Sequence, residues 1–95
     1  MLFDTHLHLI DRRRLGYPWL AGLPALDRDW SLGDYAAEAV PLGITGALHM
    51  EVDVAEDMIE AETALVAGLM ARPGSLIRGA ISSARPEAAG FADWL

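Results

Sequence analysis

The sequence contains no cysteine and no lysine. Without cysteine, disulfide bonds and thiolate metal ligands are excluded among these residues. Without lysine, neither a Schiff base nor a carboxylated lysine that bridges two metal ions can form here. No apolar run approaches the roughly 18 residues that a membrane span needs, and the N-terminus has no basic stretch followed by an apolar segment. We therefore expect a cytoplasmic protein with no membrane partner.

Positive charge is also scarce. Seven arginines oppose 14 acidic residues, which gives a formal net charge of −7. This balance repels a phosphate backbone, so nucleic acid is not expected as a partner. The only basic cluster is Arg12, Arg13 and Arg14. It is either a solvated loop face or an anion clamp, in which Arg12 holds an acidic small-molecule substrate by a bidentate contact.

The apolar content of the chain is high enough for a packed core. Hydrophobic residues make up 53% of the 95 residues, which is too apolar for an intrinsically disordered protein. This length allows one modest domain, or a piece of one, and leaves no room for a second core.

Hydrophobic spacing and turn residues predict three units, each a strand followed by a helix. Ser31 with Asp34 three residues later is a capping-box pattern that predicts the start of the first helix. The predicted strands span 2–9, 44–51 and 76–82, the predicted helices span 31–40, 53–72 and 86–95, and a long loop spans 11–30.

This order predicts the α/β class, because strands joined by helices lie parallel and are covered by helices on both faces. The three units match the first three β/α units of a (β/α)8 TIM barrel or a small open sheet, and a whole barrel needs about 250 residues. An open sheet leaves two unpaired edges. We therefore expect residues 1–95 to be the N-terminal part of such a barrel, incomplete in this chain, with self-association if the chain exists alone.

The first predicted strand carries Asp4, Thr5, His6, Leu7 and His8. Strict alternation along a strand places Asp4, His6 and His8 on one face. Neutral imidazole nitrogens suit zinc and similar divalent ions, so His6 and His8 are predicted metal ligands. Asp4 is predicted to orient them or to serve as their charge partner. A buried hydrogen-bonded group without a metal is the alternative.

Further candidate residues lie on later segments. His49 and Glu51 share a face at the end of the second predicted strand. Both are therefore predicted to reach the opening at the strand ends where His6 and His8 lie, and to contact substrate there. Satisfied polar groups are the alternative for this pair. Trp19 is predicted to line the substrate pocket. The alternative is that its side chain only packs the long loop against the rest of the domain. Arg12 completes this set of substrate contacts, and no catalytic residue is identified.

Three segments together resemble the amidohydrolase superfamily. They are Phe3-Asp4-Thr5-His6-Leu7-His8, Tyr17-Pro18-Trp19-Leu20 and Gly43-Ile44-Thr45-Gly46-Ala47-Leu48-His49-Met50-Glu51. The likeness is to the N-terminal part of its amidohydrolase 2 branch, which includes sugar-lactone and pyrone-dicarboxylate lactonases. It covers the whole chain but only about the first third of a (β/α)8 barrel. In such enzymes the His-x-His pair lies at the C-terminal end of the first barrel strand, which matches His6 and His8.

The resemblance implies hydrolysis of a lactone or a related ester or amide bond, with a divalent metal, zinc among the candidates, polarising the carbonyl while an activated water attacks. Some lactonases of this branch are thought to work without metal, so metal-independent catalysis is an implied alternative. The family's other site residues come from later strands, so the 95 residues alone are expected to be inactive. A TatD-like nuclease, whose opening Asp-Thr-His-x-His looks much the same, and a non-catalytic self-associating module are the competing hypotheses.

Overall fold

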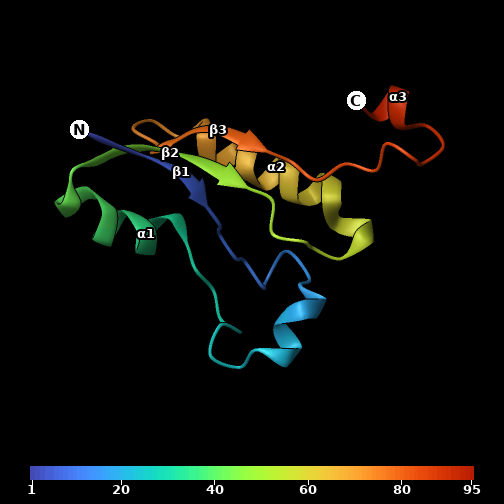
Figure 1. Ribbon diagram of the computed structural model, residues 1–95, viewed down its shortest axis with the longest axis horizontal. Helices are drawn as coiled ribbons and strands as arrows, with labels where there is room; N and C mark the ends of the chain where they lie inside the picture. The colour runs from blue at the N-terminus through green and yellow to red at the C-terminus, as the bar shows by residue number, and fades with distance from the viewer.

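A computed structural model describes residues 1–95 and contains one sheet of three strands in the order β1-β2-β3 (Figure 1). The strands are β1 (Leu2–Leu7), β2 (Ile44–Met50) and β3 (Ile77–Ile81), and both neighbouring pairs are parallel. The three strands therefore end at the same edge of the sheet. This arrangement confirms the predicted parallel α/β organisation, and the closed barrel remains a prediction.

Two helices cover one face of the sheet. They are α1 (Leu32–Ala39) and α2 (Ile59–Met70), which follow β1 and β2 in the chain. The sheet residues Leu7, Ala47 and Ile77 are buried in a cluster with Val66 of α2. On the other face, Phe3 is 50% exposed although it contacts Gly46. The expectation that helices cover both faces is therefore wrong for this chain, and we refer to the uncovered side as the open face.

The start of α1 follows the predicted capping pattern. The Ser31 side chain accepts a hydrogen bond from the Asp34 N–H, and the Asp34 side chain accepts one from the Ser31 N–H. These two bonds satisfy backbone donors that a helix N-terminus leaves free. The helix continues into the short 3-10 turn η2 (Val40–Leu42), after which Gly43 takes a left-handed conformation with φ of 85°. Glycine adopts this conformation without steric cost, so the chain can turn directly into β2.

The later helices differ from the sequence-based expectation. Asp53 has φ of 48°, a left-handed conformation that a helix cannot contain, so the second helix begins only after the 3-10 turn η3 (Glu56–Met58). The predicted third helix from Pro86 is wrong over most of its length. Only α3 (Phe91–Trp94) is helical, and it follows Gly90 at φ of 85°. No residue from Arg78 to the C-terminus is buried, so little packing supports a longer helix there.

Strand β1 contains an irregularity that changes which side chains share a face. Asp4 is the partner of Ala47 and Leu7 is the partner of His49, so three steps along β1 match two steps along β2. One extra residue is therefore accommodated in β1, as in a β-bulge. Asp4 and Leu7 both lie beside buried residues of the helix-covered face. Strict alternation along this strand, which predicts Asp4 on the same face as His6 and His8, is contradicted.

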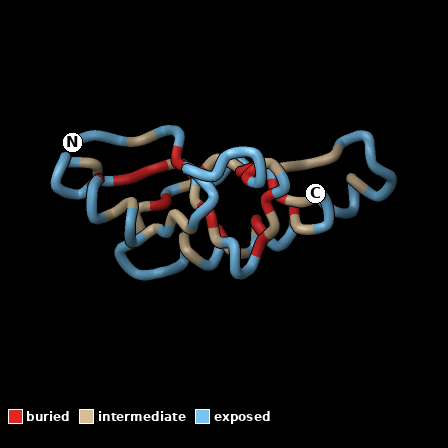
Figure 2. Tube along the Cα trace, turned by 90° about the horizontal axis from the view of Figure 1, so that it is seen from below, coloured by how far each residue is buried: buried red, intermediate tan, exposed pale blue.

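The long loop after β1 has a hydrophobic core of its own. It includes the 3-10 helix η1 (Pro18–Gly22), and it packs against the segment after β2 and the start of α2. Figure 2 shows the buried residues gathered in the middle of the molecule. The buried members of this second cluster are Ile10, Leu15, Tyr17, Leu20, Val52, Val54 and Ile59. No helix in the structure combines the length and apolar character needed to cross a membrane.

We predict that shortening a side chain in the core between the sheet and α2 destabilises the protein more than shortening one at the end of β3. Ile77→Val removes one methylene at a position that is 3% exposed, whereas Ile81 on the same strand is 51% exposed. Because a buried methylene is lost, Ile77→Val should lower the free energy of unfolding by about 0.5–1.5 kcal/mol. Urea denaturation measures this change. Ile81→Val is the control and should be nearly neutral, so equal losses at both positions would contradict this core.

Candidate functional site

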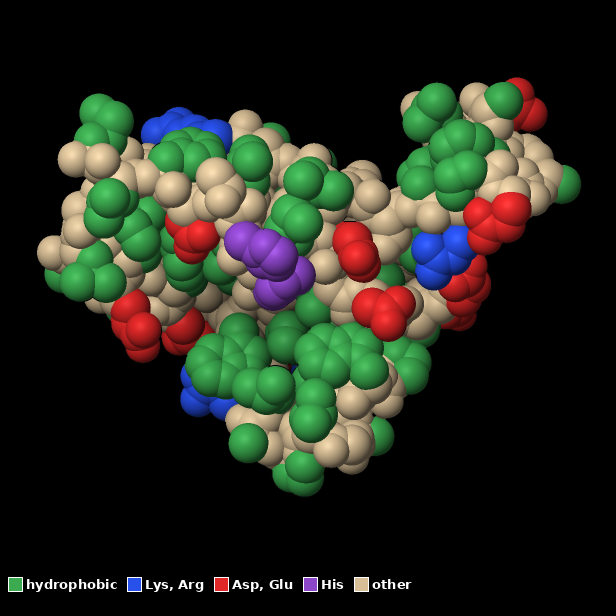
Figure 3. Space-filling model, in the orientation of Figure 1, with side chains coloured by type: hydrophobic (Ala, Val, Ile, Leu, Met, Phe, Trp, Pro, Cys, Tyr) green, Lys and Arg blue, Asp and Glu red, His purple; other side chains and the backbone are tan.

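The side chains of His6 and His8 meet on the open face of the sheet. Their Nε2 atoms are 2.9 Å apart, and the two rings lie edge to face with centroids separated by 4.7 Å. Both side chains are exposed at the downstream end of β1. Figure 3 shows histidine side chains together on the surface in the middle of this view. The structure therefore brings the two predicted metal ligands together.

A backbone carbonyl orients the ring of His8. Nδ1 of His8 lies 3.2 Å from the carbonyl oxygen of Met50, the last residue of β2. A carbonyl oxygen can only accept, so in this contact Nδ1 carries the proton and the neutral ring presents an unprotonated Nε2. In the absence of a cation, Nε2–H of His6 can donate to this atom.

Asp4 positions His6 through the backbone. Its Oδ1 accepts a hydrogen bond of 3.0 Å from the His6 N–H, and its Oδ2 accepts one of 2.8 Å from the Tyr35 hydroxyl on α1. These two bonds lower the pKa of Asp4, with the His6 N–H as the larger cause. Burial, followed by the hydrogen bond to Asp4, raises the pKa of Tyr35 to about 12. Asp4 therefore connects the backbone of His6 to Tyr35 on α1. It forms no hydrogen bond with an imidazole.

The distance between the two Nε2 atoms can be compared with the spacing of two nitrogen ligands on one metal ion. Two nitrogens bound to one zinc at about 2.0–2.1 Å lie about 2.9 Å apart at a right angle and about 3.4 Å apart at the tetrahedral angle. The observed 2.9 Å is the length of a hydrogen bond between the two rings, and it is shorter than the spacing in a tetrahedral zinc site. No group of three or more His, Cys, Asp or Glu residues that could hold a metal ion occurs in the structure. Catalytic zinc sites use three protein ligands, so the residues of this chain do not form a complete site of that kind.

His49 lies on the other side of the sheet from this pair. It is 2% exposed, it pairs in register with Leu7, and its Nε2 accepts a hydrogen bond of 3.3 Å from the Leu9 N–H. Burial, followed by the charge of His8, lowers the pKa of His49 to about 4. The ring is therefore neutral at physiological pH. The structure does not bring His49 into contact with His6 or His8, and its role in substrate binding remains a prediction.

Glu51 lies just beyond the end of β2 and organises the loop there. Its Oε2 accepts hydrogen bonds of 2.7 Å from the Asp53 N–H and 2.8 Å from the Ser83 hydroxyl. These bonds lower the pKa of Glu51, and the charge of His8 lowers it further. Glu51 therefore stays ionised within electrostatic reach of the histidine pair. Sequence reasoning missed Ser83 as its partner, because only the pairing of β2 with β3 brings the two segments together.

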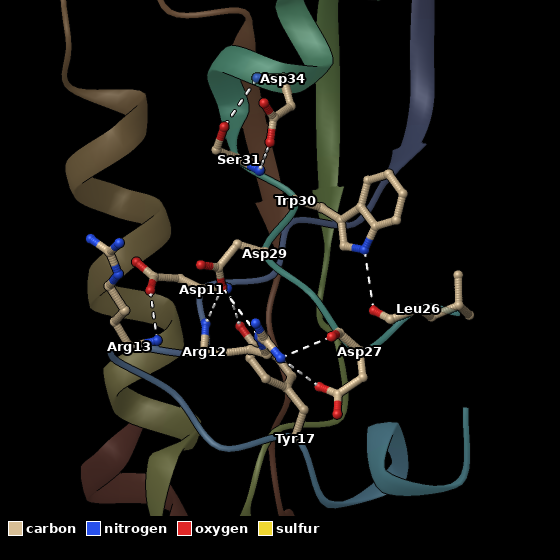
Figure 4. Close-up of polar contacts among 10 residues, drawn as sticks. All are labelled: Asp11, Arg12, Arg13, Tyr17, Leu26, Asp27, Asp29, Trp30, Ser31 and Asp34. Atoms are coloured by element: carbon tan, nitrogen blue, oxygen red, sulfur yellow. Dashed lines mark hydrogen bonds and ion pairs between the residues drawn. The ribbon is translucent and has the colours of Figure 1, made fainter. Parts of the chain in front are cut away.

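Trp19 and Arg12 are both engaged in contacts within the long loop or next to it. Nε1 of Trp19 donates a hydrogen bond of 2.9 Å to the carbonyl of Val52, and its ring packs against the loop core. The Arg12 guanidinium contacts Asp27 Oδ1 at 3.1 Å and Asp29 Oδ1 at 3.7 Å (Figure 4). Neither side chain contacts the histidine pair. Their roles in substrate binding remain predictions.

Comparison with solved structures gives an informative match. No family model matches this chain, and no curated protein matches it. Among solved structures, the chain is similar to "Amidohydrolase 2 from Bifidobacterium longum subsp. infantis", with 32% sequence identity and a TM-score of 0.73. The match covers 88% of this chain and 33% of that one, so this chain spans about a third of the length of the protein it matches. The likeness supports the amidohydrolase superfamily and a partial α/β fold of that kind.

We predict that the Tyr35 hydroxyl holds Asp4 in its ionised form. Tyr35→Phe removes the 2.8 Å hydrogen bond to Asp4 Oδ2, so the pKa of Asp4 should rise toward its ordinary value. A depressed carboxyl pKa adds stability above the unfolded-state pKa that is lost as pH falls through the folded-state pKa. The variant should therefore lose less stability on acidification. NMR titration of the carboxyl carbon measures the pKa. Tyr17→Phe is the control, because the Tyr17 hydroxyl contacts Asp11 instead.

We also predict a stability change that depends on His49. Its folded-state pKa of about 4 lies below the ordinary 6.5, so the unfolded state binds the extra proton between these values. Stability from the neutral ring is complete above about pH 6.5 and is lost as pH falls toward 4. His49→Gln keeps a hydrogen-bond acceptor without a titrating group, so its stability should fall less across this window in thermal unfolding. His6→Gln, at an exposed position, is the control. An unchanged pH slope in His49→Gln would contradict the prediction.

Proposed function

We propose that this chain forms part of an amidohydrolase-type hydrolase that acts on a lactone or a related cyclic ester or amide. The similarity to an amidohydrolase 2 protein supports a hydrolase-type fragment. The observation that carries the proposal is the 2.9 Å approach of the two Nε2 atoms on the open face, where the parallel strands end. In α/β folds of this kind, ligands bind outside the carboxyl ends of the strands.

His6 and His8 would hold a divalent cation, with zinc as the first candidate because of its affinity for imidazole nitrogens. A bound cation supplies Lewis-acid polarisation of the substrate carbonyl and a lower pKa for water. Within this chain, the Met50 carbonyl keeps the proton of His8 on Nδ1, so Nε2 is available as a ligand. Asp4 fixes the backbone of His6. The remaining ligands and the base would come from residues outside this chain.

Glu51 would line the substrate side of the site. Its carboxylate is ionised and lies within electrostatic reach of His8, and the bonds from the Asp53 N–H and the Ser83 hydroxyl hold it in place. We propose that it accepts hydrogen bonds from hydroxyl groups of a small-molecule substrate. Arg12 would have to leave Asp27 and Asp29 before it could bind an anionic lactone. The nuclease alternative gains no support, because a net charge of −7 opposes a polyanionic substrate.

The metal-binding part of the proposal is tested on the chain itself. Calorimetric titration with Zn²⁺ should detect weak binding, since the chain supplies two ligands and no group of three. His6→Ala and His8→Ala should each weaken this binding by about tenfold or more. His49→Gln is the matched control, because His49 is buried on the other side of the sheet and should leave the affinity unchanged. Equal zinc affinity in all four proteins would remove the metal site from the proposal.

The hydrolytic part requires the protein that carries these residues together with the later strands. Sugar lactones and single-stranded DNA should be assayed in parallel, and turnover is expected on a lactone. His6→Ala should reduce this turnover by about a hundredfold or more, because the variant loses a group that stabilises the transition state. Turnover of DNA, or unchanged lactonase activity in His6→Ala, would overturn the proposal.

A further inference from the structure

A second concave site lies on the helix-covered side of the sheet. It has a volume of about 370 Å³, in the size range of small-molecule pockets, and we refer to it as the α1–α2 cavity. Its lining comes from the start of α1, from one side of α2 and from the loop after β1. Neither His6 nor His8 lines it. The site is therefore separate from the histidine pair and does not depend on the proposed function.

The walls of the cavity are apolar. Leu32 at the start of α1, together with Leu65 and Leu69 on α2, contributes partly buried side chains that line the space. These leucines keep accessible apolar surface on their cavity side. An apolar segment of a ligand would remove that surface from water, which favours binding in proportion to the area covered.

The cavity also carries unpaired positive charge. Arg13 and Arg72 line it, both are exposed, and neither forms an ion pair in the structure. The two aspartates that line the cavity already have partners, because Asp11 pairs with Arg14 at 3.7 Å and Asp29 pairs with Arg12 at 3.7 Å. Figure 4 shows Arg13 extending beside α2, and it shows Ser31 at the start of α1 with its hydroxyl against the Asp34 N–H. Two guanidinium groups are therefore available to an anion.

Two backbone donors join these arginines. The capping box at α1 uses Ser31 and Asp34, and no hydrogen bond engages the N–H groups of Leu32 and Gly33. Leu32 and Gly33 both line the cavity. Free N–H groups in the first turn of a helix favour a bound anion. Arg13, Arg72 and the start of α1 therefore line one cavity with positive charge and backbone donors.

The floor of the cavity contains two buried polar side chains. His49 is 2% exposed and Glu62 is 3% exposed, and both line the cavity. Nε2 of His49 accepts the Leu9 N–H, so Nδ1 carries the proton of the neutral ring and has no partner in the chain. Oε2 of Glu62 accepts the Val52 N–H at 3.0 Å, and Oε1 has no hydrogen-bond partner. A donor is therefore available at the floor.

We propose that the α1–α2 cavity binds a small organic monocarboxylate whose far end carries a carbonyl oxygen. The carboxylate lies among Arg13, Arg72 and the start of α1, the apolar middle lies between Leu32 and Leu69, and the carbonyl accepts the Nδ1–H of His49. A carboxylate is the complement of this site, because Arg13 and Arg72 line it without ion pairs. A short oxo acid carries a carboxylate, an apolar middle and a carbonyl in this order.

Binding is tested by NMR titration of the chain with 5-oxohexanoate. Backbone amide signals of Leu32, Gly33 and Leu69 should shift, while those of His6 and His8 stay in place. Hexanoate lacks the carbonyl and hexan-2-one lacks the carboxylate, so both should bind more weakly, each by about fivefold or more. Equal binding of hexan-2-one would overturn the anion site, and equal binding of hexanoate would overturn the role of His49.

Substitutions separate the cavity from other surfaces. Arg13→Gln and Arg72→Gln should each weaken 5-oxohexanoate binding by about tenfold, because each removes a charge-assisted contact. Arg78→Gln is the matched control, since Arg78 is also exposed and free of ion pairs but does not line the cavity. His6→Ala should bind normally. Loss of binding in His6→Ala, or an Arg78 effect equal to that of Arg13, would overturn the proposal and leave the hydrolase proposal untouched.

Discussion

The extra residue in β1 between Asp4 and Leu7 is the constraint on which the site depends. It shifts the register from Asp4–Ala47 to Leu7–His49 and so breaks the simple alternation of faces. Asp4 can then contact Tyr35 on α1 while His6 and His8 meet on the open face. A bulge bends a strand and redirects its side chains, which is why bulges occur near functional sites. Here it links the histidine pair to the helix layer through one carboxylate.

The sheet separates two polar environments of different character. On the open face, the histidine pair is accessible, and just beyond the end of β2 Glu51 is kept ionised by an N–H group and a hydroxyl. On the helix-covered face, His49 and Glu62 are buried, and burial favours the neutral form of each. His49 and Glu51, which are two residues apart in the sequence, therefore differ in charge. The buried His49 ring is neutral, whereas the Glu51 carboxylate is ionised. The parallel strands make this separation possible, because neighbouring residues of one strand point to opposite sides.

Much of the fold could be predicted from local patterns. Apolar runs with turn residues between them gave the three strands, and the Ser31–Asp34 capping box located α1, because these signals act over a few residues. The second helix began later than predicted, since Asp53 adopts a left-handed conformation stabilised by Glu51. The third helix was overestimated, because Pro86 permits a helix but packing is needed to stabilise one. Helix propensity alone did not stabilise a helix from Pro86 onward, because that segment has few tertiary contacts.

By itself, the sequence determined the parallel α/β order and the closeness of His6 and His8, because both follow from residues a few positions apart. Tertiary structure alone decided that Asp4 binds Tyr35, that Glu51 binds Ser83, and that His49 faces α2. It also decided that Arg12 is paired within its loop, whereas Arg13 is free. These contacts join segments far apart in the chain. Strand register, the extra residue in β1 and loop packing determine which distant side chains meet, and no local pattern encodes that choice.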